Sequence, residues 1–198
     1  MPVPPFNNDG IIPPYLGLVP GRAHRDQTPY HVSAAELVEA LNGTLDRCTI
    51  LQGWLDHRAE LRRLGFVMGF QWVDGSFVEN KTPKDADVVT FVRRPRAASL
   101  IAQVLMLRHA NPEVFDRDRV KATYRLDAFF VDLDGTSEAI VDTASYWFGL
   151  FSHRRGDDAW KGMLRVNLDD VLDDQSARQL VANKAASFAV AVPPVGAP

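Results

Sequence analysis

Two aspartates, Asp85 and Asp87, begin a segment with the composition of a β-strand, Asp85–Val92. Side chains two positions apart on a strand point to the same face, so the two carboxylates are expected to lie side by side. Two such anions repel unless a cation neutralises them, and Mg²⁺ or Mn²⁺ prefers carboxylate oxygens. Asp127 adds a third carboxylate if its own predicted strand is the neighbour. The three predict a two-metal site, in which Asp127 also helps to deprotonate an attacking hydroxyl.

A Gly-Ser turn follows the preceding predicted strand, Phe66–Val73. Gly75 lets backbone N–H groups approach phosphate oxygens, and Ser76 adds a hydroxyl donor. This turn is therefore expected to hold the terminal phosphates of a nucleoside triphosphate (NTP). A Gly-Ser turn or an Asp-x-Asp pair alone is more often an ordinary loop feature. Their order, each beside a predicted strand, favours a nucleotide site.

The order Gly75-Ser76, Asp85-Ala86-Asp87 and then Asp127 resembles the nucleotidyltransferase superfamily related to polymerase β, over roughly residues 66–133. Lys161-Gly162 is similar to a feature of bacterial nucleotidyltransferase-like proteins of unknown function. The resemblance implies an α+β (α/β) fold with a small mixed sheet backed by helices. It also implies that the turn binds the triphosphate and that the three carboxylates hold two Mg²⁺ ions. Such an enzyme moves a nucleoside monophosphate from an NTP to an acceptor hydroxyl and releases pyrophosphate.

The resemblance leaves the acceptor open between an RNA end such as that of a tRNA, a protein hydroxyl and a small molecule. It also implies a place in a toxin–antitoxin or phage-defence module, where some members pair with a helical HEPN-type partner. The alternative is a catalytically inactive binding or interaction protein on the same fold. This chain departs from the family pattern in its short spacer between Ser76 and Asp85 and in having an acid at Asp74.

Two basic groups follow the predicted site. Arg93, Arg94 and Arg96 come directly after the Asp85–Val92 strand, while Arg154, Arg155 and Lys161 follow the helix after Asp127. Arg154 and Lys161 are assigned to nucleotide binding. Either group could neutralise a triphosphate, contact RNA phosphates or form a solvated face. The net charge is −3, so an RNA acceptor requires these cations to form a local patch beside the carboxylates.

Other polar residues have simpler interpretations. Asp132-Leu-Asp-Gly135 lacks the glutamate of a calcium loop and is expected to be a turn. Asp173 and Asp174 are expected to be solvated helix-start charges, and Arg47 and Arg58 helix-surface residues. Cys48 is expected to be a small buried apolar residue. The five histidines show no metal-ligand spacing, and surface or capping roles are expected for them: His24, His31, His57, His109 and His153.

The composition is that of an ordinary globular protein, with 198 residues, 46% hydrophobic and 24% charged. We expect an extended proline-rich arm over residues 1–30, one nucleotidyltransferase-like domain over 31–188 and a flexible tail over 189–198. The apolar runs are too short to span a bilayer, the N-terminus does not match a secretory signal, and Cys48 is the single cysteine. A cytoplasmic protein without a membrane partner is therefore expected.

The elements that must position the site follow from local patterns. Ser33 and Glu36 fit a capping box at the start of a helix, and a second helical pattern over residues 50–64 stops at Gly65. The remaining helices are expected at Arg96–His109, Ser137–Phe151 and Gln175–Phe188, and further strands at Tyr124–Asp132 and Lys161–Leu168.

Overall fold

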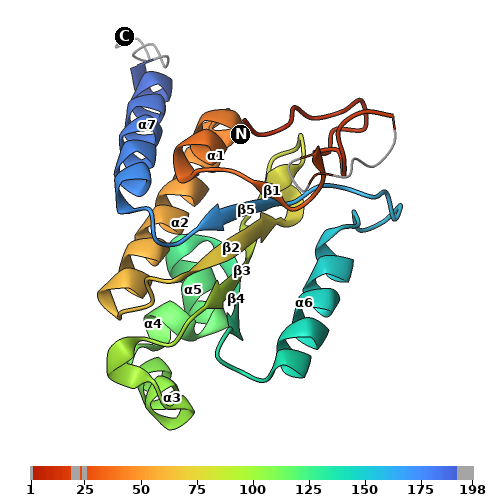
Figure 1. Ribbon diagram of the computed structural model, residues 1–198. Coiled ribbons are helices and arrows are strands. Elements are labelled where there is room, and N and C mark those ends of the chain that lie inside the picture. The colour runs from red at the N-terminus through yellow and green to blue at the C-terminus, as the bar shows by residue number, and fades with distance from the viewer. Residues whose placement is uncertain (1, 19–22, 24–25, 191–198) are drawn as a thin grey trace.

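A mixed five-stranded sheet, with the strand order β1-β5-β2-β3-β4, runs through the protein in the computed structural model, which describes residues 2–18, 23 and 26–190 (Figure 1). The strands are β1 (Tyr30–His31), β2 (Gly69–Asp74), β3 (Ala86–Val92), β4 (Leu126–Asp132) and β5 (Leu164–Asn167). The helices are α1 (Ala34–Leu41), α2 (Leu45–Arg63), α3 (Ile101–Ala110), α4 (Pro112–Phe115), α5 (Arg117–Tyr124), α6 (Ser137–Phe151) and α7 (Val171–Val190). The fold is therefore α+β, as the sequence predicts.

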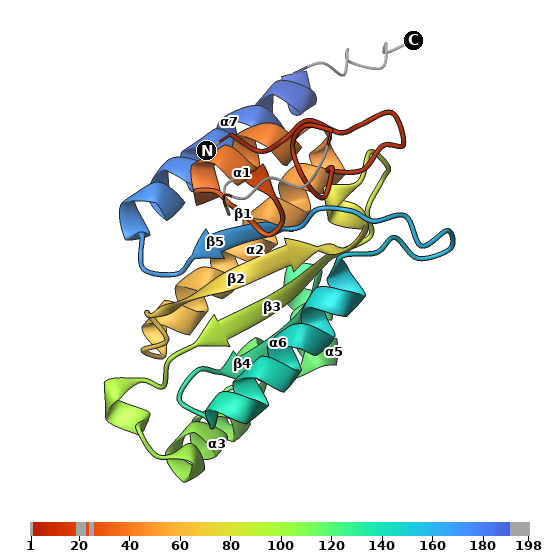
Figure 2. The ribbon, with the colours of Figure 1, turned by 45° about the vertical axis from the view of Figure 1, so that its right-hand side comes forward.

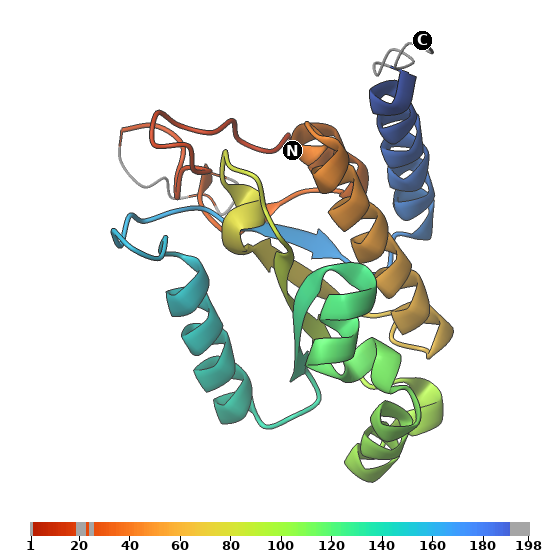
Figure 3. The ribbon, with the colours of Figure 1, turned by 180° about the vertical axis from the view of Figure 1, so that it is seen from behind.

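The two faces of the sheet are covered unequally. Helices α1, α2 and α7 lie on one face, and α6 lies on the other (Figures 2 and 3). Strand β2 is antiparallel to both β3 and β5, whereas β4 runs parallel to β3. Side chains of Trp72, Val89 and Phe91 form the core beneath α6. The next positions along the same strands, Val73 and Val88, join the larger core beneath α2.

Helix α1 begins and helix α2 ends where their capping residues predict, although α2 begins at Leu45, before the expected residue 50. Ser33 accepts a hydrogen bond from the N–H of Glu36, whose carboxylate accepts from the N–H of Ser33, so α1 begins with the expected capping box. The C-terminal end of α2 is followed by Gly65 with a φ of +90°, a conformation that few other residues adopt without strain. Helix α6 has the predicted bounds.

Two short helices were not predicted. The expected helix Arg96–His109 begins only at Ile101, and α4 and α5 then occupy the segment before β4. Pro112 stands at the start of α4, and the Asp116 side chain caps α5 by accepting from the N–H of Arg119. Helix α5 extends through Tyr124, so the strand expected from that residue starts at Leu126.

The proline-rich segment at the start of the chain is anchored in the fold. Ile11 and Ile12 are buried, and the Ile12 carbonyl accepts a hydrogen bond from the N–H of Gly162 at 2.7 Å. The Tyr30 hydroxyl donates to the carbonyl of Pro13 at 2.8 Å. Residues 19–22, His24 and most of the expected tail, 191–198, lie outside the described residues. Within the described part, no helix combines the length and hydropathy that a bilayer crossing needs.

Arg58 and Asp174 form a buried ion pair beneath the sheet, which corrects the expectation that both are solvent-exposed. The Arg58 guanidinium donates to both Asp174 carboxylate oxygens at 2.8 Å and to Gln71 Oε1 at 2.9 Å. Gln71 Oε1 also accepts from Trp54 Nε1, and Gln71 Nε2 donates to Thr90 Oγ1. The apolar periodicity of α2 hides this role, because a buried arginine and an exposed one look alike until the partner from α7 is known.

His57 is buried against α4 with its Nε2–H donating to the Val114 carbonyl at 2.9 Å, and its Nδ1 has no partner among the described residues. Burial lowers the pKa of His57 to about 4, an effect strengthened by Arg58 and opposed by the Val114 hydrogen bond and Glu60. In the unfolded chain the imidazole regains its ordinary pKa of about 6.5, so protonation favours unfolding as the pH falls through this window.

We therefore expect the free energy of unfolding to fall by about 2 kcal/mol more in the wild type than in His57→Gln between about pH 7.5 and about pH 5. Urea denaturation of both proteins at the two pH values measures the difference. Glutamine keeps an N–H donor for Val114 but does not titrate. Parallel pH profiles for the two proteins would contradict the assigned burial of a neutral imidazole.

Candidate functional site

Three aspartates lie in one row across the sheet. Asp74 of β2 is the register partner of Asp87 of β3, and Asp87 is in turn the register partner of Asp127 of β4. Side chains at paired positions point to the same face, which here is the face covered by α6. Asp85 immediately precedes β3 and stands two positions from Asp87. Asp127 therefore lies on the same face as Asp85 and Asp87, with Asp74 as an additional acid that the sequence reasoning did not assign.

A cavity of about 230 Å³ opens over this row. It brings together the Gly-Ser turn, the carboxylates and several cations. Its lining residues are Asp74, Gly75, Ser76, Glu79, Lys81, Asp85, Asp87, Lys121, Asp127, Leu150, Phe151, His153, Arg155 and Lys161. All the sequence-predicted site residues line the cavity except Arg154.

The Gly-Ser turn packs directly against Asp87. Gly75 begins a 3-10 turn, Gly75–Val78, and has a φ of +77°. A Cβ atom at this position would overlap the Asp87 Oδ2 atom, so only glycine lets the turn and the carboxylate meet. Arg47 stabilises the turn, because its guanidinium donates hydrogen bonds to the carbonyls of Phe77, Glu79 and Lys81. Arg47 is buried, not on the helix surface as expected, because it satisfies these carbonyls.

Of the three predicted metal ligands, Asp87 is the one that contacts no cation directly among the described residues. Its carboxylate has no hydrogen bond or ion pair within the described part of the chain, whereas Asp85 pairs with Lys121 and Asp127 pairs with Arg117. Burial raises the pKa of Asp87, and the neighbouring charges of Asp127 and Asp85 raise it further. A cation placed beside Asp87 would relieve this repulsion.

Two cations from α5 contact the other carboxylates. Arg117 donates to both oxygens of Asp127 at 2.5 and 2.6 Å and lowers the pKa of that carboxyl. Lys121 Nζ lies 2.6 Å from Asp85 Oδ2 and 4.0 Å from Asp127 Oδ2. Both cations are roughly half-exposed, and their spacing of four residues places them on one face of the helix. Two of the three predicted metal ligands are therefore already neutralised by the chain itself.

Lys161 lies deep in the cavity and is not free to meet a ligand. Its Nζ is 3.2 Å from Asp74 Oδ2, 3.2 Å from Glu79 Oε1 and 3.0 Å from the Gly75 carbonyl. Asp74 is buried, and its Oδ1 has no partner among the described residues. Burial raises the pKa of Asp74 to about 7, against the lowering effect of Lys161. Lys161 therefore stabilises the Gly-Ser turn by contacting the Gly75 carbonyl while it pairs with Asp74 and Glu79.

Arg154 and Arg155 face different surroundings. Arg154 pairs with Asp157 and donates to the Asp9 carbonyl at 2.7 Å, outside the cavity. Arg155 lines the cavity, and in the part of the chain that the structure describes it has no hydrogen bond or ion pair. Its charge lowers the pKa values of both Asp87 and Asp127. Arg155, not Arg154, is therefore the available cation of this loop.

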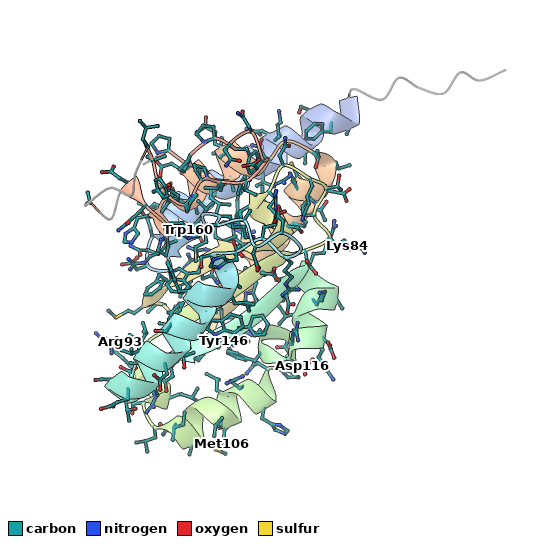
Figure 4. The ribbon with its side chains drawn as sticks, turned by 90° about the vertical axis from the view of Figure 1, so that its right-hand side faces the viewer. Lys84, Arg93, Met106, Asp116, Tyr146 and Trp160 are labelled. Carbon is teal, nitrogen blue, oxygen red and sulfur yellow. The ribbon has the colours of Figure 1, made fainter. Side chains whose placement is uncertain are left out.

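The basic residues after β3 do not lie beside the carboxylates, contrary to the patch expected for an RNA acceptor. Arg93 follows the C-terminal end of β3, whereas Lys84 lies just before Asp85 at its other end, and the two are far apart in Figure 4. Arg93 pairs with Asp134, and Arg94 pairs with Asp132. A seven-residue strand separates them from the cavity by about 20 Å.

The donor set suits a hard divalent ion in kind, because Asp85, Asp87 and Asp127 supply carboxylate oxygens on one wall of the cavity. Among the described residues, however, no three histidine, cysteine, aspartate or glutamate side chains form a preformed metal centre. The three carboxylates therefore share one wall of the cavity without forming a preformed metal centre. Binding of an ion by all three requires Arg117 and Lys121 to leave them.

Besides Asp74, sequence reasoning missed two site residues, the cations Arg117 and Lys121 of α5. Arg117 and Lys121 belong to a helix that was not predicted, so no pattern connected them to the carboxylates. The available signal was their spacing of four in a segment that ends two residues before the Asp127 strand.

Comparison with known proteins gives a family but no activity. Residues 4–167 match a family described as "Family of unknown function (DUF6932)". No curated protein and no solved structure matches the chain.

Proposed function

Since the chain belongs to the DUF6932 family, whose function is unknown, we propose a function from its own cavity: metal-dependent transfer of a nucleoside monophosphate from an NTP to an acceptor hydroxyl. The observation that carries the proposal is the contact between the Gly-Ser turn and Asp87, in the same cavity as Asp85 and Asp127. A turn suited to phosphates and carboxylates suited to Mg²⁺ are the two parts such a reaction needs.

Each residue has a distinct part in this proposal. Asp85, Asp87 and Asp127 would hold Mg²⁺ or Mn²⁺, which neutralises the charge of the phosphates when it is bound. Gly75 and Ser76 would contact the terminal phosphates. Asp127, at the edge strand β4, would help to take the proton from the acceptor hydroxyl. Lys161 has a positioning role, because its contacts hold the turn and not a ligand.

The proposal is tested by incubating the protein with each α-labelled NTP, Mg²⁺ or Mn²⁺, and total RNA, tRNA or lysate. Label on a macromolecule or small acceptor, with release of pyrophosphate, supports transfer and identifies the acceptor class. Label that appears equally without divalent metal contradicts the proposed chemistry.

Arg155 is expected to bind the triphosphate, so Arg155→Ala should weaken binding of the Mg²⁺–NTP complex by about tenfold or more. Arg154→Ala is the matched control, because Arg154 is adjacent but is paired with Asp157 outside the cavity. Isothermal titration with a non-hydrolysable NTP analogue measures both. Equal effects of the two substitutions would contradict the assignment of Arg155.

Of the possible acceptors, RNA has the least support. Arg93 and Arg94 are paired with Asp134 and Asp132 at the end of β3 remote from the cavity. Binding of tRNA that falls steeply with salt and is lost with Arg155→Ala would support an RNA acceptor. Absence of salt-sensitive binding leaves a protein or small-molecule hydroxyl.

A catalytically inactive protein on this fold is the second candidate, and one observation favours it. Arg117 and Lys121 already neutralise Asp127 and Asp85, as cations would in a site that has lost its metal. The two candidates differ in how metal affects stability. An active site should give a higher melting temperature with Mg²⁺ and NTP together, whereas an inactive one should show no metal-dependent shift.

A further inference from the structure

Helix α3 exposes an unusual amount of apolar surface at the end of the molecule remote from the cavity. Leu100, Ile101, Leu105 and Met106 are between 50% and 72% exposed, and Val104 is the one buried side chain of the helix. Met106 lies at the periphery of the molecule in Figure 4, and α3 stands at one end of the fold in Figure 1. Large side chains gathered in this way typically mark a binding surface.

A small apolar groove adjoins these side chains. Ile101, Val104 and Leu105 form its α3 side, and Phe130 and Val131 of β4 lie opposite. Its volume is about 80 Å³, which gives room for an aliphatic side chain of a partner. Because β4 is the last strand of the sheet, no strand of the described chain covers this side.

The segment that carries this surface contains charges of one sign. Residues 93–109 contain four arginines and no acid. Arg94 and Arg108 line the groove together with Asp132, which is already paired with Arg94. Arg108 lies over the rings of Phe115 and Phe130, and no carboxylate of the described residues pairs with it. The charged group at the groove that has no carboxylate partner among the described residues is therefore the Arg108 guanidinium, which packs on two phenylalanine rings.

We propose that the α3 surface, formed by Leu100, Ile101, Leu105, Met106 and Arg108, binds an acidic amphipathic segment of another protein. Apolar side chains of that segment would enter the groove, and its carboxylates would pair with Arg108. A second copy of this chain is disfavoured, because a symmetric contact would place the same arginines against each other. The helix also lacks the separate polar and apolar faces of a helix that lies in a membrane surface, since apolar side chains surround it.

The test uses two short fluorescent peptides that carry leucines at helical spacing, one with glutamate and one with lysine at the remaining positions. We expect the glutamate peptide to bind the wild-type protein at least about tenfold more tightly than the lysine peptide. Leu105→Glu should weaken binding of the glutamate peptide by about tenfold, and Arg108→Glu should reverse the preference between the peptides. Tyr146→Glu, at an exposed position on α6, is the matched control and should change neither affinity.

Four results would overturn the proposal. They are equal binding of the two peptides, an equal loss in Leu105→Glu and Tyr146→Glu, self-association abolished by Leu105→Glu in sedimentation, and α3-dependent binding to phosphatidylserine vesicles. Circular dichroism of the variants checks that each retains the fold. None of these readouts depends on nucleotide transfer, so the outcome is independent of the function proposed for the cavity.

Discussion

Asp87→Asn is expected to reduce metal-dependent nucleotide transfer by about a thousandfold or more while the protein keeps its fold. Asp87 faces the cavity and, among the described residues, has no direct ion-pair partner, and it packs against the Gly-Ser turn. An amide of the same shape preserves that packing but removes the charge that would hold an ion. The labelling assay with α-labelled NTP measures the loss.

The same substitution should leave the free energy of unfolding unchanged or raise it. Burial and the charges of Asp127 and Asp85 raise the pKa of Asp87, so its ionised form is disfavoured in the folded protein. Asp134→Asn is the control, because Asp134 is a surface residue paired with Arg93 at the far end of β3. Equal labelling by wild type and Asp87→Asn would show that catalysis does not run through this cavity.

Asp174→Ala is expected to destabilise the protein by about 3–5 kcal/mol. Arg58 is fully buried, and Asp174 is the carboxylate that neutralises it through two hydrogen bonds of 2.8 Å. Without Asp174, the guanidinium keeps neutral partners such as Gln71 but has no counter-charge in the core. Guanidinium chloride denaturation of the variant and the wild type measures the difference.

Asp157→Ala provides the comparison for a surface ion pair. Asp157 also pairs with an arginine, Arg154, but its side chain is half-exposed, so its removal is expected to destabilise the protein far less than removal of Asp174. A similar small cost for Asp174→Ala would mean that water reaches Arg58 in the folded protein. A variant that no longer folds would agree with a destabilisation at the upper end of the predicted range.

Local chemistry was sufficient to predict most of the elements that carry the cavity. The capping residues of α1, the glycine after α2 and the aromatic and branched residues of the strands determine these elements from their own segments. Asp85 and Asp87 share a face because of strand geometry alone. Asp127 shares this face only because β4 lies next to β3. The sequence alone did not determine that strand order.

The pairing partners could not be predicted because they depend on contacts between distant segments. Arg58 meets Asp174 across 116 positions, and Lys161 meets Glu79 across 82. Within its own helix or loop, each of these charged residues occupies a position that is typical of a solvent-exposed residue. Arg117 and Lys121 were missed for a related reason, since α5 is short and polar and lacks a strong apolar period.

The pairing of β1 with β5 has a consequence for how the chain folds. Tyr30 pairs with Leu164 in parallel register, and the Ile12 carbonyl pairs with Gly162, so the earliest segments of the chain contact segments made more than 130 residues later. During synthesis, Tyr30 and Ile12 must wait until β5 has emerged from the ribosome, although α1 and α2 can already form. Contacts of such long sequence separation slow folding, and apolar residues of the early segment stay exposed in the interval. The nascent chain is therefore expected to be most prone to aggregation just before residue 168 becomes available.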